Sequence, residues 1–245
     1  MEFKKLIAPS LKEMFIEHIQ SMILSGELPI GEKLPPERSL AESMGISRAV
    51  VNSGIVELER MGFLSIHPRV GTFVADYRRK GTLETLKAIM SYNRGRLRDD
   101  EVRSILQVRD ALDKLAVTCI IPVATDGEVE RILEKVEAIK KSQSIEEAAR
   151  AAFAFQHELA MVSGNTLLPL IFRSFYFSTI ILWERFCSLH GIDALYAVSY
   201  NLWKHISNRD LEGALKWVED STYEAVYGSR QIYYDSNRET KQPDQ

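Results

Sequence analysis

The chain has 245 residues, of which 45% are hydrophobic and 27% are charged, and its formal net charge is −3. This composition is typical of a globular protein with one large or two medium domains, and it excludes a disordered chain. No apolar run approaches the roughly 20 residues that a membrane-spanning helix needs, and the first residues lack the apolar core and cleavage site of a signal peptide. We therefore expect a cytoplasmic protein without a membrane partner.

The mild net charge also limits how this protein could bind nucleic acid. Since no strong positive field surrounds the chain, any such binding must depend on the local placement of a few cations. The two cysteines, Cys119 and Cys187, lie far apart in apolar helical sequence. This arrangement favours buried thiols over a disulfide or a metal site.

Three helices are predicted near the start of the chain. The first begins after Ser10, which forms a capping box with Glu13, and it ends at Gly26. A connector rich in Pro and Gly leads to a short second helix that ends at Gly45. The third helix begins after Ser47, whose hydroxyl is a suitable N-cap.

The third predicted helix has two different faces. Val51, Ile55 and Leu58 repeat at helical spacing and are expected to face the core. The opposite face carries mostly short or hydrogen-bonding side chains: Arg48, Ala49, Asn52, Ser53 and Val56. Two short strands around residues 68–71 follow. Three helices followed by two strands describe a winged helix-turn-helix. The second helix of this motif, which is the third predicted helix of the chain, enters the major groove of DNA. The alternative is that this third helix is an ordinary surface helix.

The domain organisation follows from where the strand signal ends. We expect a winged helix-turn-helix over residues 1–77, a linker at 78–82, an all-α domain over 83–235 and a disordered tail at 236–245. The fold class is thus mainly α, an N-terminal winged helix-turn-helix plus a C-terminal all-α helical bundle. The bundle is long enough to enclose a cavity.

Two blocks of the second domain are each predicted as helical throughout. They cover residues 166–189 and 210–234. The first block is unusually apolar and aromatic, with Phe172, Phe175, Tyr176 and Trp183 at near-helical spacing. It fits either a central core helix or a cavity wall shaped for an acyl chain.

The first domain resembles the GntR family of bacterial transcription regulators. The similar segments are residues 34–41, 45–48 and 71–74, together with Val51, Leu58 and Gly62. The resemblance implies DNA contacts from Arg38, Ser47 and Arg48, with Ala49 facing the bases. It also implies that the wing near Pro68 and Arg69 reaches the minor groove.

Two positions depart from the family pattern. The position after Val51 usually holds Arg and is Asn52 in this chain, while the usual Gly-Arg-Gly of the wing is Arg69-Val70-Gly71. Asn can pair with adenine through two hydrogen bonds, so we expect Asn52 to contribute to a different operator preference.

The second domain resembles the all-helical effector domain of the FadR subfamily, often abbreviated FCD. Residues 108–112, 163–165 and Asp210 carry this looser similarity. Many members hold a divalent metal with one Asp and three His. The matching positions in this chain are Ala152, Gln156, Ser199 and Ser221.

None of these four residues can supply the ligands of a tight metal site. His157 is one position away from Gln156, which turns it by about 100° on a helix, and His190 and His205 are displaced as well. We therefore expect no metal and no cofactor, with a small molecule in a metal-free pocket. A metal-and-carboxylate-sensing regulator of the same family remains the alternative.

The effector candidates follow from chemistry and position. Arg109 and Arg173 could bind a carboxylate or phosphate, although either could equally form a structural ion pair. Gln156, Ser199, Ser221 and Tyr176 are candidate lining residues. The resemblance to the fatty-acid-responsive members extends to residues 83–86 and implies an organic acid or acyl-CoA effector and a role in fatty acid metabolism.

These features predict a ligand-responsive, homodimeric transcription regulator that binds a palindromic DNA operator and is associated with the bacterial nucleoid. An enzyme is a remote alternative. The sequence contains no Gly-rich phosphate loop, no HExxH, no Gly-x-Ser-x-Gly and no Cys/His cluster.

Overall fold

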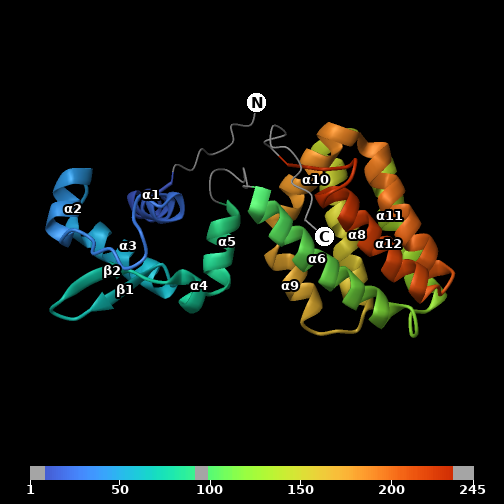
Figure 1. Ribbon diagram of the computed structural model, residues 1–245, viewed down its shortest axis with the longest axis horizontal. Coiled ribbons are helices and arrows are strands. Elements are labelled where there is room, and N and C mark those ends of the chain that lie inside the picture. Colours follow the sequence, from blue (N-terminus) through green and yellow to red (C-terminus); the bar gives the residue numbers. More distant parts are fainter. Residues whose placement is uncertain (1–8, 92–98, 234–245) are drawn as a thin grey trace, which may run out of the picture. The chain divides into compact units, whose positions relative to one another are not determined.

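The computed structural model describes residues 9–91 and 99–233 (Figure 1). The chain divides into two compact units, Met1–Arg94 and Gly95–Gln245, and each unit is described by itself. Within the described residues, no helix has both the length and the apolar character needed to cross a membrane.

The first unit begins as a winged helix-turn-helix, which confirms the predicted fold. Its elements are α1 (Leu11–Ser25), α2 (Glu37–Met44), α3 (Arg48–Arg60), β1 (Leu64–His67) and β2 (Gly71–Val74). The strands pair antiparallel, from Leu64 opposite Val74 to His67 opposite Gly71. A single β-bridge joins Lys33 to Phe73 and ties the connector between α1 and α2 to the wing.

The helices of this unit begin and end where the caps predict. The Ser10 hydroxyl accepts a hydrogen bond from Glu13 N at 3.2 Å, and the Glu13 carboxylate accepts one from Ser10 N at 2.7 Å. Gly26 and Gly45 end α1 and α2 with φ of 86° and 65°, a conformation that glycine adopts without a steric cost. Ser47 caps α3 by accepting from Val50 N at 3.3 Å.

The core of the first unit lies between α1, α3 and the wing. Its buried hydrophobic residues include Phe15, Ile19, Ile23, Leu34, Leu40, Val51, Ile55, Leu58, Phe63 and Val74. Gly54 in α3 has a packing reason, because a Cβ at this position would come within 2.3 Å of Phe15 Cδ1. The glycine therefore allows α1 and α3 to approach closely.

The structure differs from the expected linker at residues 78–82. Most of that segment belongs to α4 (Tyr77–Lys80), and α5 (Leu83–Ser91) follows after Gly81. Tyr77, Ala88 and Ile89 pack against the core of the first unit. The sequence interpretation placed the domain boundary at residue 83 because it did not recognise the apolar face of α5. The structure divides the two units after residue 94.

A buried hydroxyl connects α5 to the end of α3. Thr85 is only 2% exposed, and its Oγ1 donates a hydrogen bond to the carbonyl oxygen of Met61, the C-cap residue of α3. Thr85 Oγ1 also accepts a hydrogen bond from Thr82 N at 2.7 Å. Thus α5 contacts the C-terminal end of α3.

The second unit is all-α, as expected. Its helices are α6 (Asp99–Ile120), α7 (Asp126–Lys140), α8 (Ile145–Val162), α9 (Leu168–Ser174), α10 (Tyr176–His190), α11 (Ile192–Ser207) and α12 (Leu211–Val226). α8 packs against α7 and α10, α11 packs against α7 and α12, and α12 packs against α6 (Figure 1).

Two helical predictions in this unit were too long. The block 166–189 contains two helices, α9 and α10. They are separate because Phe175 N donates a hydrogen bond to Phe172 O, three residues earlier, in place of the four-residue spacing of an α-helix. α12 ends at Val226, and the Glu224 carboxylate accepts hydrogen bonds from the backbone N and the hydroxyl of Ser229. We call residues 228–233 the C-terminal strap. The predicted tail at 236–245 lies outside the described residues.

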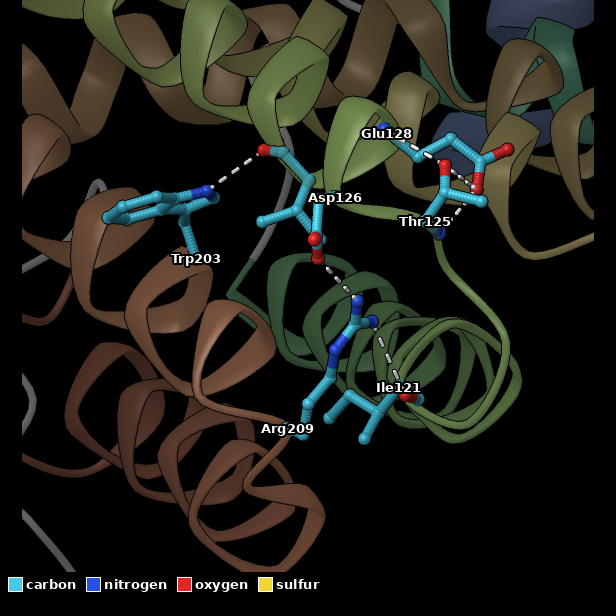
Figure 2. A network of polar contacts seen from close by, with 7 residues as sticks. Ile121, Thr125, Asp126, Glu128, Trp203 and Arg209 are labelled. Atoms are coloured by element: carbon cyan, nitrogen blue, oxygen red, sulfur yellow. Dashed lines mark hydrogen bonds and ion pairs between the residues drawn. The ribbon is translucent and has the colours of Figure 1, made fainter.

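One end of the bundle is held by the polar contacts in Figure 2. Arg209, between α11 and α12, donates hydrogen bonds to the Ile121 carbonyl oxygen at 3.5 Å and to Asp126 Oδ1 at 3.4 Å. Trp203 Nε1 donates to the Val129 carbonyl oxygen at 3.0 Å. We call the Arg209 contacts the arginine clasp; they fix the turn between α11 and α12 against the start of α7.

Candidate functional site

The exposed face of α3 carries mostly short or hydrogen-bonding side chains, as the sequence predicted. Arg48, Ala49, Asn52, Ser53 and Val56 are exposed, whereas Val51, Ile55 and Leu58 are almost completely buried. Short side chains near the start of a helix allow its backbone to approach another surface closely. The cap at Ser47 also leaves backbone N–H groups at this end, which favour an anion such as phosphate.

Two carboxylates of α2 contact the polar residues near this face. Arg38 Nε donates a hydrogen bond to Glu42 Oε1 at 2.8 Å within α2. Asn52 Nδ2 on α3 donates to Glu37 Oε1 on α2 at 3.0 Å. Arg38 and Asn52 thus lie at the surface but each already has a partner within the chain.

The wing presents Arg69 at the tip of the hairpin. Val70 N donates to the His67 carbonyl oxygen at 3.0 Å and closes a turn in which Pro68 is the second residue and Arg69 the third. Arg69 has φ of 64°, which together with Pro68 is typical of a type II turn. Its side chain is exposed and makes no hydrogen bond or ion pair within the described part of the chain.

The second unit contains a cavity of about 350 Å³. It lies among α6, α8, α10, α11, α12 and the C-terminal strap. Four of the six predicted effector residues lie on its wall: Arg109, Gln156, Ser199 and Ser221. Its apolar lining includes Leu106, Phe155, Leu182, Trp183, Phe186, Leu202, Trp217 and Ile232.

Arg109 has unusual surroundings for a charged side chain. It is 7% exposed, its guanidinium lies over the Trp183 ring at 4.6 Å from the ring centroid, and it forms no ion pair with a described carboxylate. Its Nε atom has no hydrogen-bond partner among the described residues. A buried cation without a hydrogen-bonded anion is costly, so an anion entering the cavity would be strongly favoured at this position.

A chain of hydrogen bonds runs along the same wall. Trp183 Nε1 donates to Gln156 Oε1 at 3.2 Å, and Gln156 Nε2 donates to Asp113 Oδ2 at 3.4 Å. Burial raises the pKa of Asp113 from 3.8 to about 6, although the charge of Arg109 partly opposes this rise. Asp113 Oδ1 has no hydrogen-bond partner within the described residues. The wall therefore offers both a cation and a carboxyl group that is easily protonated.

The other two predicted effector residues lie elsewhere. The Arg173 guanidinium is 4.7 Å from the Tyr176 ring centroid and 5.9 Å from that of Phe153, and neither Arg173 nor Tyr176 lines the cavity. Of the four aromatic residues singled out between 172 and 183, only Trp183 reaches the cavity wall. Phe172 and Phe175 are buried in the core.

The positions that hold metal in many related domains do not fit a metal in this chain. Gln156, Ser199 and Ser221 all line the cavity, and Ala152 is buried. Among the residues that the structure describes, no three His, Cys, Asp or Glu are arranged to hold a metal ion. The three histidines considered in the sequence analysis have other contacts. His157 stacks on Phe153. His190 Nε2 lies 3.3 Å from the Gln231 carbonyl oxygen, and His205 Nδ1 lies 2.8 Å from Asp210 Oδ2.

The sequence interpretation missed three parts of the cavity wall. Asp113 lies four residues after Arg109 on α6, so helical spacing could have identified it. Trp183 was interpreted only as a member of an apolar block, so the hydrogen bond that its indole N–H donates was not predicted. Arg230, with Ser229 and Ile232 of the C-terminal strap, also lines the cavity. These residues were missed because the segment was predicted to continue the last helix.

Comparisons with known proteins agree with the two units. Residues 11–74 match the family described as "Bacterial regulatory proteins, gntR family", and residues 104–220 match the FCD domain. A solved structure of Lar, described as controlling expression of the Listeria monocytogenes agr system, superposes with a TM-score of 0.62 at 17% identity. It covers 90% of this chain and 97% of that one, which shows a shared fold.

Several relatives are named as transcription regulators. The chain is 37% identical to the HTH-type transcriptional regulator Mce2R of Mycobacterium tuberculosis over 44% of its length, and 30% identical to LutR of Bacillus subtilis over 60%. It is 28% identical over 65% of its length to the fatty acid metabolism regulator protein of Shewanella halifaxensis, of which 65% is covered. These matches span 45% of Mce2R and 65% of LutR. The chain thus combines a first unit that carries a gntR-family domain, over residues 11–74, with a second unit that carries an FCD domain, over residues 104–220.

Proposed function

We propose that this protein is a ligand-responsive transcription regulator that binds a palindromic DNA operator as a homodimer. The exposed, small and polar face of α3 carries this proposal. Its residues Arg48, Ala49 and Asn52 are supported by a buried apolar face and a capped start, so they form a rigid surface of the size that enters a major groove.

The six proposed DNA contacts have different roles. Arg48 reaches a guanine edge or a phosphate, Ala49 allows close approach to the bases, and Asn52 contacts a base. Ser47, with the first backbone N–H groups of α3, holds a phosphate. Arg38 contacts the backbone after leaving Glu42, and Arg69 extends from the wing into the minor groove.

We further propose that the effector is a compact organic anion without a metal. Arg109 would bind its carboxylate, and Gln156, Ser199 and Ser221 would contact its polar groups. A volume of about 350 Å³ is near the small end of ligand cavities. An acyl-CoA would have to leave its nucleotide part outside, so the cavity favours a smaller organic acid.

An effector would control transcription by changing the spacing of the two DNA-binding units. Two α3 helices of a dimer reach successive major-groove faces when they are about 34 Å apart. The dimer would exchange between an arrangement whose spacing fits DNA and one whose spacing does not. A ligand shifts this equilibrium only if it binds one arrangement more tightly than the other. This proposal places the protein on the bacterial chromosome.

Selection from a random duplex library tests the DNA-binding proposal. The purified chain is expected to enrich a short palindrome and to protect it from cleavage. Arg48→Ala is expected to abolish this binding, whereas Arg60→Ala, at the other end of α3 and paired with Glu57, serves as the matched control. If Arg48→Ala binds the selected duplex as tightly as the unchanged chain, α3 is not the recognition helix.

Native mass spectrometry of freshly expressed protein tests the effector proposal. We expect a co-purified organic anion that is absent from Arg109→Gln, and no divalent metal. A stoichiometric metal would instead support the metal-and-carboxylate-sensing alternative, despite the residues at the corresponding positions.

A further inference from the structure

Glu37 is an acidic residue on the surface that we assign to DNA. It is the first residue of α2, it is half-buried, and it makes no ion pair with a described cation. A carboxylate near the phosphate backbone repels DNA and lowers affinity at every sequence. A role in binding must therefore come from something other than attraction to phosphate.

The only side chain that Glu37 contacts by a hydrogen bond within the described residues is Asn52. Oε1 of Glu37 accepts from Nδ2 of Asn52 at 3.0 Å, which joins the start of α2 to the second turn of α3. Arg38, next to Glu37 in the sequence, is bound instead to Glu42. The carboxylate of Glu37 is thus directed at the one recognition-helix residue that departs from the family pattern.

We propose that Glu37 is a positioning residue, which fixes the amide of Asn52 so that this residue selects adenine in the operator. The inference rests on the proposed DNA-binding function and deepens it. Since the acidic side chain repels phosphate but orders a base contact, Glu37 lowers general affinity while it raises selectivity.

The chemistry of the two side chains determines the orientation of the amide. A carboxylate only accepts hydrogen bonds, so the NH₂ group of Asn52 must face Glu37 and its Oδ1 must face away. Oδ1 makes no hydrogen bond within the described part of the chain. Because an NH₂ group has two N–H bonds, one remains available beside Oδ1 while the other is held by Glu37.

The remaining edge of Asn52 matches one base. It offers a donor and an acceptor side by side, and adenine presents the complementary N7 acceptor and N6 donor in the major groove. Without Glu37, the amide is free to rotate and can present its donor and acceptor in either order. Ordering the amide before binding reduces the entropy lost on complex formation.

The test compares operator selection by three full-length chains. The unchanged chain, Glu37→Gln and Asn52→Ala are each presented with a duplex library randomised over the operator. The unchanged chain is expected to prefer adenine about 10-fold at one position of each half-site. Asn52→Ala removes this preference. Glu37→Gln reduces it several-fold, because a glutamine amide both donates and accepts and lets Asn52 turn over.

Two further measurements separate positioning from general stabilisation. Glu37→Gln should bind a duplex of unrelated sequence more tightly, since it removes a negative charge, although it binds the selected operator less selectively. Replacing the selected adenine with 7-deazaadenine, which lacks N7, should weaken binding by the unchanged chain and have less effect on Glu37→Gln. A purely structural role would change neither the base preference nor the response to 7-deazaadenine.

Glu42→Gln is the matched control. It also removes a carboxylate of α2 but does not touch Asn52, so it should leave the adenine preference unchanged. If no duplex is enriched by the unchanged chain, both the proposed function and this inference fail. If a duplex is enriched but Glu37→Gln keeps the full adenine preference, only the inference about Glu37 fails.

Discussion

Arg69 in the wing and Arg209 in the helical unit share a left-handed backbone but have different surroundings. Their φ values are 64° and 58°, and no other non-glycine residue of the described chain has positive φ. This conformation costs a residue with a Cβ about 1 kcal/mol. Arg209 offsets the cost through its hydrogen bonds to Ile121 and Asp126 (Figure 2). Arg69 makes no such contact with any residue that the structure describes, which fits a side chain that binds an outside partner.

The same contrast applies to the buried polar groups. The hydroxyl of Thr85 has both a donor and an acceptor partner inside the first unit. The carboxyl of Asp113 and the guanidinium of Arg109 each retain an atom without a hydrogen bond in the described residues. Groups satisfied inside the chain should stabilise the fold, whereas unsatisfied groups should lower its stability and favour a ligand.

The largest effect is expected at Asp113. Its pKa of about 6 lies above the ordinary value of 3.8, so ionisation of Asp113 opposes folding. This cost is absent below about pH 4, grows as the pH rises to about 6, and then reaches about 3 kcal/mol near pH 7. Asp113→Asn removes the charge and should stabilise the ligand-free protein by about that amount at pH 7.

Denaturant unfolding of the second unit measures this effect directly. All three tryptophans lie in that unit, so their fluorescence follows its unfolding. Asp220→Asn is the control, because Asp220 lies on the cavity wall but is exposed, and it should change stability little at any pH. Equal stabilities of Asp113→Asn and the unchanged chain at pH 7 would contradict the prediction.

The next effect is expected at Thr85, where the polar group is satisfied. Thr85→Val keeps the shape of the side chain but leaves the Met61 carbonyl oxygen and the Thr82 N–H without this partner. The first unit should lose about 2 kcal/mol. Hydrogen exchange of the amides in α3 and α5 should show the loss, and Thr85→Ser should retain most of the protection. Unchanged exchange in Thr85→Val would show that the hydroxyl contributes nothing.

Removing the arginine clasp should have a smaller effect. Arg209→Ala loses two long hydrogen bonds but keeps a Cβ in the left-handed region, so the second unit should lose about 1 kcal/mol. Arg209→Gly loses the same bonds but relieves the backbone, and it should be close to the unchanged protein. If the two variants have equal stability in tryptophan-monitored unfolding, the backbone cost does not explain the clasp.

Local signals predicted the first unit well because its information lies in short segments. The capping box at Ser10, the cap at Ser47 and the inward spacing of Val51, Ile55 and Leu58 all depend on residues within a few positions of one another. The partner of Asn52 could not be found in this way. Glu37 lies 15 residues earlier, and only the packing of α2 against α3 brings the two side chains together.

In the second unit, the sequence predicted helices but not their ends or their shared cavity. Of the four effector candidates on the cavity wall, Gln156, Ser199 and Ser221 were chosen because they match positions of a related domain, and Arg109 was chosen for its charge. Arg173 was chosen for its charge alone and lies instead beside Tyr176. The C-terminal strap follows from the contacts of Glu224 with Ser229, which helical periodicity could not reveal.

The smallest change in stability, but a clear change in binding, is expected at Arg69. Arg69→Gly places glycine at a left-handed position and should raise the stability of the first unit by up to about 1 kcal/mol. It also removes the cation proposed to enter the minor groove, so affinity for the selected operator should fall and the salt dependence of binding should weaken by about one counterion. Arg69→Ala loses the same cation but keeps the backbone cost, so the two variants should bind DNA equally and differ in stability. If Arg69→Gly instead binds the operator as tightly as the unchanged chain at every salt concentration, then the left-handed arginine of the wing has no partner in DNA.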